Sequence, residues 1–298
     1  MSAPAAARRR AVALSALRVR TLPAAVVPVV VGTAVALRAG PIDPWLAALA
    51  LGAALLIQIG TNLVNDWGDF RRGSDGPARL GPLRAAQSGL FSPRAVAAAG
   101  CGAFALAALL GLPLVTHGGW RILAIGLASI AAGAAYTAGP FPLAYHGLGE
   151  AFVLLFFGPV AVCGTELLLA GATSRLGFAA SLPVGLLATC ILLVNNIRDL
   201  DGDRKAGKRT LAVRLGRAAS RGLYVGILGL ALAVPALLVR LRLTDPPALI
   251  ALASVPLAVA PARSVLRRED GPPLNAALAG TARLHLAFGV LLAAGIAW

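Results

Sequence analysis

The sequence predicts an all-α integral membrane protein, a polytopic helical bundle of about nine transmembrane helices. The chain has 298 residues, of which 58% are hydrophobic and only 13% are charged. Soluble domains carry about 25% charged residues, so a chain this poor in charge cannot cover a water-facing surface. A mean hydropathy of +0.80 agrees with this interpretation.

Long apolar runs locate the predicted membrane-spanning elements. A helix rises about 1.5 Å per residue, so about 20 apolar residues cross roughly 30 Å of hydrocarbon. The runs that reach or approach this length are, in order, Leu22–Leu37, Trp45–Leu63, Ala95–Val115, Ile122–Ala138, Ala151–Ala170, Leu176–Val194, Leu223–Val239, Pro247–Ala262 and Leu274–Trp298. Tilting or snorkelling ends could extend the shorter runs, so about eight spans is the alternative count.

Basic residues alternate between the connections, and this alternation predicts the orientation in the membrane. The net charge is +15, and the N-terminal segment holds Arg8, Arg9, Arg10, Arg18 and Arg20. The second, sixth and eighth connections carry most of the other basic residues, whereas the odd-numbered connections carry isolated ones. We therefore expect a cell inner-membrane protein with a cytoplasmic N-terminus. On such a protein the positive charge need not mean a nucleic-acid partner, and we expect the lipid bilayer as partner and no nucleic acid.

Acidic residues gather in two short windows, each at the cytoplasmic end of a long apolar run. The windows read NLVNDWGDFRRGSD (Asn62–Asp75) and NNIRDLDGDRKAGKRT (Asn195–Thr210), and they hold six of the 12 acidic residues of the chain. Charged residues near a membrane core are costly, so such clusters indicate function. The alternative is a pair of ordinary solvated loops, which would explain the basic residues but not three aspartates in each window.

Both windows repeat one spacing. Asn62 precedes Asp66 by four residues, and Asn195 precedes Asp199 by four, which places each pair on one face of a helix. The windows are four predicted spans apart, as in a weak internal repeat. We therefore predict a single domain over residues 1–298 with two repeated halves, about 1–140 and 141–298, facing one another across one site on the cytoplasmic side.

The residue types in the windows point to a metal-bridged diphosphate. Carboxylate and amide oxygens are hard ligands suited to Mg²⁺, which often binds through a few carboxylates together with substrate phosphates. The basic residues that could bind phosphate are Arg71 and Arg72 in the first window, Arg79 and Arg84 shortly after it, and Arg198, Arg204, Lys205, Lys208 and Arg209 in the second window. Interleaved acid and base fit this chemistry better than a bare cation channel.

A Gly- and Pro-rich turn, YTAGPFPLAYHGLGE (residues 136–150), lies on the same predicted side of the membrane. We expect it to wall the site, and the alternative is a plain connecting turn. The candidates for acceptor binding or catalysis, including the base that activates a phenol, are Tyr136, Tyr145, His146 and Glu150 from this turn and Asn195 from the second window.

Several ordered strings resemble the UbiA superfamily of intramembrane aromatic prenyltransferases over nearly the whole chain. They are RVRTLPAAVVPVVVGTA (Arg18–Ala34), GSDGPARLGPLRAAQSG (Gly73–Gly89), YHGLGEAFVLLFFGPVAVCGTE (Tyr145–Glu166), NNIRDLDGDRKAGKRTLAVRLG (Asn195–Gly216) and TARLHLAFG (Thr281–Gly289). The commoner first motif of that family spaces its aspartates four apart. The three-residue spacing of Asp66 and Asp69 instead resembles the branch that acts in menaquinone synthesis.

The resemblance implies a nine-helix bundle and a reaction. The substrates would be an all-trans polyprenyl diphosphate and 1,4-dihydroxy-2-naphthoate, and the naphthoate would lose CO₂ to give demethylmenaquinone and diphosphate. The implied Mg²⁺ ligands are Asn62, Asp66, Asp69, Asp199 and Asp203, with Arg72, Arg198, Lys205 and Lys208 binding the diphosphate. An apolar cavity open to the bilayer would hold the lipid tail and keep water from the allylic cation.

Two alternatives remain open at this stage. Another aromatic acceptor, such as 4-hydroxybenzoate or homogentisate, would use the same diphosphate site. A membrane transporter would instead place charged residues at mid-membrane depth along a pathway, whereas here they gather at one face.

Overall fold

The computed structural model describes residues 12–74, 80–81 and 84–298, and every regular element within these ranges is helical. Arg8, Arg9, Arg10, Asp75 and Arg79, named above, lie outside them. The elements are η1 (Val19–Thr21), α2 (Pro23–Ala39), α3 (Pro44–Arg71), α4 (Pro93–Ala135), η2 (Leu143–His146), α5 (Gly149–Leu155), η3 (Phe156–Val160), α6 (Ala161–Ala170), α7 (Arg175–Lys205), α8 (Leu211–Leu215), α9 (Arg217–Arg240), η4 (Pro246–Ser254), α10 (Pro256–Arg267) and α11 (Gly271–Ala297).

The predicted all-α membrane bundle is confirmed. Among the described residues, 6 helical segments are long and apolar enough to cross a membrane, and the bent pair of η4 and α10 raises the number to 7. Helix α2, at 17 residues, falls just short of that length. The number of nine spans therefore stays a prediction.

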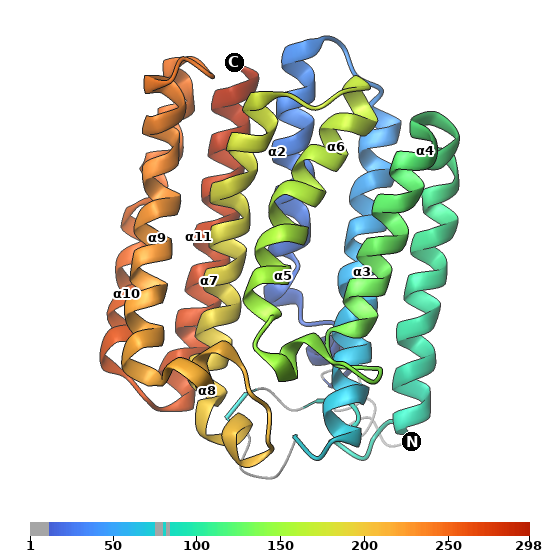
Figure 1. Cartoon of the computed structure of the whole chain (residues 1–298), viewed down its shortest axis with the longest axis vertical. Helices are drawn as coiled ribbons and strands as arrows, with labels where there is room; N and C mark the ends of the chain where they lie inside the picture. The colour runs from blue at the N-terminus through green and yellow to red at the C-terminus, as the bar shows by residue number, and fades with distance from the viewer. Residues whose placement is uncertain (1–11, 75–79, 82–83) are drawn as a thin grey trace, which may run out of the picture.

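Helix α4 holds two of the predicted runs, Ala95–Val115 and Ile122–Ala138, because the chain bends sharply between them. Gly119 has a φ of 69° and a ψ of −160°, a conformation that glycine adopts without a steric penalty. Figure 1 shows the two arms of α4 side by side, joined at the top of the view. No strong turn signal in the sequence marks the break apart from the Gly118–Gly119 pair.

Helix starts follow from capping residues at the predicted boundaries. Asp43 accepts a hydrogen bond from the backbone N–H of Trp45, and Ser174 accepts one from Gly177, so each satisfies an N–H that has no partner within its helix. Proline occupies the first turn of α2, α3 and α4, where its missing N–H costs nothing. These caps fix the start of α3 and α7, the helices that carry the acidic windows.

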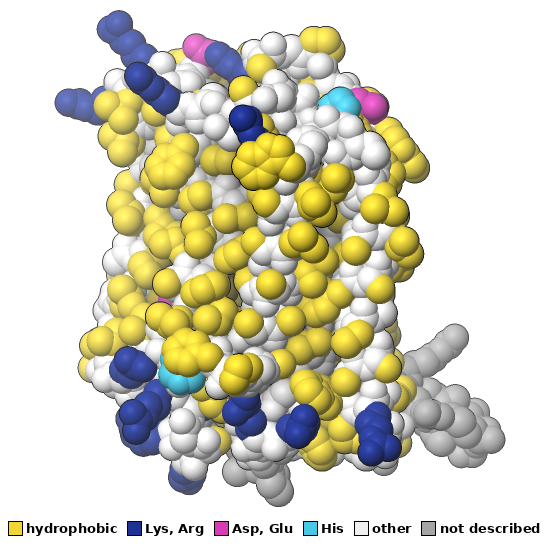
Figure 2. Space-filling view, turned by 45° about the vertical axis from the view of Figure 1, so that its right-hand side comes forward, with side chains coloured by type: hydrophobic (Ala, Val, Ile, Leu, Met, Phe, Trp, Pro, Cys, Tyr) yellow, Lys and Arg dark blue, Asp and Glu magenta, His cyan; other side chains and the backbone are white. Residues whose placement is uncertain are grey.

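Helix α7 forms the centre of the bundle. In its apolar window 72% of the residues are buried, and Leu187, Leu193 and Ile197 are fully buried. It packs against α9, α11 and α5. The other helices expose apolar side chains: Leu109 and Leu112 on α4 are each 60% exposed. Figure 2 shows hydrophobic side chains across the middle of one face, with Lys and Arg at both ends, as a multi-pass membrane protein requires.

Close helix contacts depend on glycine, as is usual where packing and not burial from water holds helices together. A Cβ on Gly295 of α11 would lie 2.4 Å from the carbonyl oxygen of Pro247 and 2.6 Å from the Cα of Ala248, both backbone atoms of η4. The G295A variant should therefore lose about 1–3 kcal/mol of stability. Thermal unfolding of the purified protein in detergent measures this loss.

The matched control is Gly229→Ala on α9, where a Cβ would meet nothing within 4 Å. This variant should unfold with the wild type or slightly above it, because alanine reduces the freedom of the unfolded chain. Equal unfolding temperatures for both variants would contradict the close contact between α11 and η4.

Candidate active site

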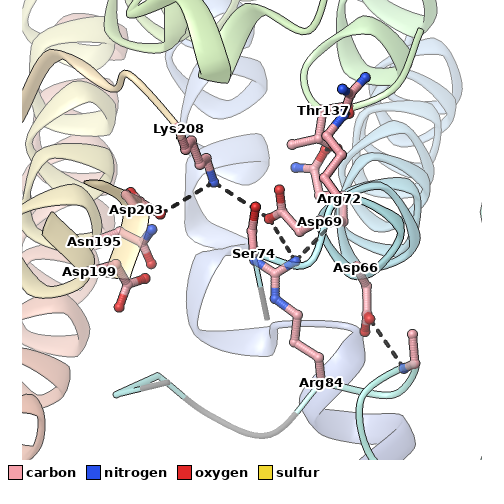
Figure 3. A network of polar contacts seen from close by, with 12 residues as sticks. Asp66, Asp69, Arg72, Ser74, Arg84, Thr137, Asn195, Asp199, Asp203 and Lys208 are labelled. Atoms are coloured by element: carbon pink, nitrogen blue, oxygen red, sulfur yellow. Dashed lines mark hydrogen bonds and ion pairs between the residues drawn. The ribbon is translucent and has the colours of Figure 1, made fainter. Parts of the chain in front are cut away.

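The two acidic windows meet at one end of the bundle. Helices α3 and α7 both end there (Figure 1), the first carrying Asp66 and Asp69 and the second Asp199 and Asp203. The Nζ of Lys208 lies 3.5 Å from Oδ2 of Asp69 and 3.9 Å from Oδ1 of Asp203 (Figure 3). One ammonium group thus lies between carboxylates of both windows, although more than 130 residues separate them in the sequence.

Asp69 is a buried carboxylate with several polar partners. It is 2% exposed, its Oδ2 lies 2.8 Å from Nη1 of Arg84, and its Oδ1 accepts a 2.9 Å hydrogen bond from the hydroxyl of Tyr145. A buried carboxylate is stable only when it is paired in this way. Asp69 therefore has the strong positive surroundings that keep a carboxylate ionised.

Asp66 has a different environment, even though it belongs to the same motif. Its Oδ2 accepts from the N–H of Ala85 at 2.8 Å and its Oδ1 from the N–H of Ala86 at 3.2 Å. Asp66 thus attaches the segment that follows Arg84 to helix α3. Asn62, the predicted partner of Asp66, donates to the carbonyl of Leu17 at 3.2 Å.

Asn62, Asn65 and Asp69, spaced three and four residues apart, line the polar end of the cavity from one face of α3. Asn65 was not among the predicted site residues, because the four-residue Asn–Asp spacing pairs Asn62 with Asp66 and does not include Asn65. The Oδ1 of Asn65 accepts from the hydroxyl of Thr137 at 2.8 Å, which joins α3 to the end of α4.

The guanidinium of Arg198 is hydrogen-bonded to neighbouring side chains, and Arg198 does not line the cavity. Its Nε and Nη2 hold both oxygens of Asp199, at 2.8 and 2.6 Å, and Nη2 also donates to Oδ1 of Asn195 at 2.8 Å. Its Nη1 donates to Oδ1 of Asn275 at 2.7 Å, and Asn275 in turn donates to the carbonyl of Leu80. Arg198 was predicted to bind the diphosphate, but in the structure it holds Asp199 and Asn195 and does not line the cavity.

Of the other three predicted diphosphate ligands, Arg72 and Lys205 lie away from the cavity, and Lys208 lines it. Arg72 donates to the carbonyls of Thr137 and Gly139, at 3.4 and 2.7 Å, and its guanidinium lies 5.1 Å from the Tyr145 ring centre. Lys205 is exposed at the end of α7. Of the four basic residues predicted to bind diphosphate, only Lys208 lines the cavity.

The turn between α4 and α5 contributes Tyr136 and Tyr145 to the site but directs His146 elsewhere. Burial, together with the charges of Glu150 and Asp69, raises the pKa of Tyr136. Burial and the charge of Asp69 likewise raise the pKa of Tyr145. Both phenols therefore stay protonated at neutral pH, and the Tyr145 hydroxyl donates its hydrogen bond to Asp69. His146 stacks on the ring of Phe141, with ring centres 3.8 Å apart, and contacts the carbonyl of Pro142, so its ring packs within the turn and does not line the cavity.

A cavity of about 230 Å³ extends from this polar end into the bundle. Its inner walls are apolar and include Phe152 and Phe156, whose rings stack at 5.9 Å, together with Ile57 and Ile191. The polar end is lined by Arg18, Asn62, Asn65, Asp69, Arg84, Asn195, Asn196 and Lys208. This combination suits a ligand with a charged head and an apolar tail.

Arg18 and Arg84 also line the cavity. The sequence named Arg84 only among the basic residues that could bind phosphate, and Arg18 only as part of the basic N-terminal segment. Each lies in a string that resembles the family, Arg18 before the first span and Arg84 after the second. Both were visible as cations, but only folding places them at the same end as Lys208. Arg18 also has a left-handed backbone with a φ of 49°, a strained conformation that is common at functional sites.

The donor set suits a hard divalent cation that shares its coordination with phosphate. Among the described residues no group of three or more His, Cys, Asp or Glu side chains is close enough to hold a metal ion. The carboxylates of Asp69 and Asp203 nevertheless reach one position, which the Lys208 ammonium occupies. Mg²⁺ commonly needs only one or two protein carboxylates besides phosphate oxygens and water, so these residues fit it.

A multi-pass membrane bundle whose apolar cavity ends in paired acidic and basic side chains has the features of an intramembrane enzyme. The UbiA prenyltransferase family model matches residues 25–294. The chain belongs to this family, which confirms the resemblance inferred from the sequence motifs.

Curated relatives and solved structures agree with this family membership. The 1,4-dihydroxy-2-naphthoate octaprenyltransferase of Mycobacterium tuberculosis is 39% identical over 285 residues, 96% of each chain. The enzyme of that name from Escherichia coli is 38% identical over 289 residues, covering 95% of this chain and 94% of its own. An apo UbiA homologue from Aeropyrum pernix has the same fold, with a TM-score of 0.67 and 19% identity over 93% of this chain and 95% of its own. A homologue from Archaeoglobus fulgidus, bound to DMAPP and Mg²⁺, has a TM-score of 0.62 and 17% identity over 93% and 97%.

Proposed function

We propose that this enzyme transfers a polyprenyl group from an all-trans polyprenyl diphosphate to 1,4-dihydroxy-2-naphthoate, with loss of CO₂, in menaquinone synthesis. The observation that carries the proposal is the similarity to relatives named 1,4-dihydroxy-2-naphthoate octaprenyltransferase, at 31–39% identity over nearly the whole chain. The cavity supports the proposal because it is apolar inside and charged at its mouth, and a prenyl diphosphate likewise has an apolar chain and a charged head.

The mouth of the cavity would bind the diphosphate. Mg²⁺, held by Asp69 and Asp203 with the predicted ligands Asn62, Asp66 and Asp199, would offset the charge of the diphosphate and favour its departure. Arg18, Arg84 and Lys208 also face this end, and they would bind the phosphate oxygens as the allylic C–O bond breaks. Lys208 thus keeps its predicted role, and Arg18 and Arg84 take the place of Arg72, Arg198 and Lys205 as the proposed diphosphate ligands.

The inner cavity would receive the isoprenoid chain. Phe152, Phe156 and Ile191 offer apolar and aromatic walls, which exclude water that would otherwise trap the allylic cation. The new C–C bond takes its electron pair from the electron-rich ring. The bond forms at the ring carbon that carries the carboxylate, so loss of CO₂ returns the electron pair to the ring and restores aromaticity. The transfer therefore gives the diol and requires no oxidant, and the quinone form, demethylmenaquinone, arises by a separate two-electron oxidation.

The charge pattern supports a cytoplasmic location for the site end of the bundle. The N-terminal segment and the windows that follow the second and sixth predicted runs are rich in Arg, and basic residues are retained on the cytoplasmic side. A cysteine introduced at exposed Lys205 should therefore react with a membrane-impermeant reagent only in inverted vesicles.

Arg198→Lys tests whether Arg198 orients a metal ligand. Lysine cannot hold both oxygens of Asp199 in the way that a guanidinium does. The variant should raise the Mg²⁺ concentration for half-maximal activity about 10-fold, with little change in the KM of the prenyl diphosphate at saturating Mg²⁺. Initial rates over a Mg²⁺ series measure both values.

The control for this experiment is Arg204→Lys, at an exposed arginine 3.8 Å from Asp201, which should behave as the wild type. A raised KM for prenyl diphosphate without a change in Mg²⁺ dependence would instead restore Arg198 as a direct diphosphate ligand.

Product analysis tests the function itself. The purified enzyme, Mg²⁺ and a mixture of prenyl diphosphates would be incubated separately with 1,4-dihydroxy-2-naphthoate, 4-hydroxybenzoate and homogentisate. We expect a prenylated, decarboxylated naphthalene product by mass spectrometry. Activity with 4-hydroxybenzoate or homogentisate alone would overturn the naphthoate assignment. Ion flux without prenyl transfer would indicate a transporter.

A further inference from the structure

Glu150 is a buried acid that lies apart from the two acidic windows. It stands in the first turn of α5 and is 5% exposed. Its Oε1 accepts a 2.8 Å hydrogen bond from Nδ2 of Asn196, while its Oε2 has no hydrogen-bond partner within the described residues. Buried polar atoms almost always have partners, so this arrangement requires an explanation.

The contact with Glu150 fixes which end of the Asn196 amide faces the cavity. An asparagine side chain has a donor end and an acceptor end. Because Nδ2 of Asn196 points to Glu150, Oδ1 remains as a hydrogen-bond acceptor on a residue that lines the cavity. Neighbouring Asn195 has the opposite orientation. Its Oδ1 receives the hydrogen bond from Arg198, which leaves its Nδ2 as a donor.

The surroundings of this amide pair suit a flat aromatic ring with polar substituents. Tyr136 lines the cavity from the end of α4, and its hydroxyl lies close to Gly149, immediately before Glu150. Phe152 on α5 and Phe156 at the start of η3 also line the cavity, with ring centres 5.9 Å apart. Apolar walls with a few oriented polar groups are the usual form of a small-molecule site.

We propose that Glu150 and Asn196 form the recognition site for a ring hydroxyl of the aromatic acceptor. Oδ1 of Asn196 accepts the hydroxyl proton in a hydrogen bond, and Glu150 is a positioning residue that keeps the amide turned toward the acceptor. The inference rests on the proposed function, and it assigns the acceptor half of the site to α5 and α7. The diphosphate half is formed by Asp69, Lys208 and their neighbours.

This arrangement favours attack by the ring without requiring a proton to leave it permanently. A hydroxyl that donates a hydrogen bond releases electron density into its ring, which makes the ring a better nucleophile toward the allylic cation. A site with an oriented acceptor also rejects rings that lack the hydroxyl, because the buried amide oxygen would then have no partner.

Steady-state kinetics of Glu150→Leu and Glu150→Gln test the proposal. Leucine removes the anchor of Asn196, so the KM for 1,4-dihydroxy-2-naphthoate should rise about 10-fold or more, while the KM for prenyl diphosphate stays within about 2-fold. Glutamine still offers a carbonyl oxygen to Nδ2 of Asn196, so E150Q should keep an acceptor KM near that of the wild type. Equilibrium binding of the naphthoate alone should show the same order.

Asn196→Ala keeps the test decisive if E150L fails to fold. It should raise the acceptor KM as E150L does, and the double variant should add little, because both changes remove one linkage. The matched control is Glu166→Gln. Glu166 is another buried acid, on α6 beside the start of α7. The E166Q variant should leave the KM values of both substrates unchanged.

Two outcomes would overturn the proposal. Equal loss of kcat in E150Q and E150L, with the acceptor KM unchanged, would make Glu150 a proton acceptor. Wild-type acceptor binding in E150L and N196A would place acceptor recognition elsewhere. A wild-type enzyme that does not prenylate the naphthoate at all would instead refute the proposed function, which separates the two failures.

Discussion

Replacing Asp69 with asparagine is expected to lower kcat/KM for prenyl transfer by about a thousand-fold or more. Asparagine keeps the size of the side chain and can still accept from Tyr145, but it removes the negative charge that faces Arg84 and Lys208. Without that charge the two windows cannot share a divalent cation. The measurement is the initial rate of the purified enzyme with labelled prenyl diphosphate over a range of Mg²⁺ concentrations.

The second window offers a control within the same motif. Asp201 lies between Asp199 and Asp203 in sequence, but its side chain is 67% exposed and pairs with Arg217 at 2.7 Å. D201N should therefore keep activity within about 2-fold, since exposed ion pairs contribute little. If D69N retained substantial activity, or if D201N lost as much as D69N, the site would not be organised around Asp69.

The sequence predicted well what depends on local spacing and composition. Apolar length and charge alternation were enough for a helical membrane bundle, because spanning a bilayer imposes both. The sequence also separated the two apolar runs on either side of Gly119 correctly. It did not predict that the chain stays helical up to a sharp bend at this one glycine. The acidic windows were also found by composition, since charge at a membrane boundary is costly to keep.

The direction of each side chain could not be predicted, because it depends on residues remote in sequence. Arg198 is held by Asn275, 77 positions away, and Asp66 by the backbone of Ala85. Both were assigned to ligand binding from their motifs alone. Arg18 and Arg84 show the converse, since neither lies close to the second window in sequence and both line the cavity beside it.

Lys208→Met is expected to change catalysis and metal binding in opposite directions. The Lys208 ammonium lies between Asp69 and Asp203, so its removal leaves two carboxylates with less positive charge between them. A divalent cation should then bind about 10-fold more tightly, because charges about 4 Å apart interact strongly even at intermediate dielectric constants. Turnover should fall about a hundred-fold or more, since the departing diphosphate loses a cation. Binding of Mn²⁺ followed by electron paramagnetic resonance, together with initial rates, measures the two effects.

Lys205→Met provides the matched control, because these are the only two lysines in the chain and Lys205 is exposed. This variant should resemble the wild type in both measurements. Lys208→Arg should recover part of the activity but not all of it, since the bulkier guanidinium must fit the same space between the carboxylates. Unchanged Mn²⁺ affinity in K208M would show that the ammonium does not occupy the place of the metal. Equal loss of turnover in K205M and K208M would mean that general positive charge, and not this position between the two windows, stabilises the diphosphate.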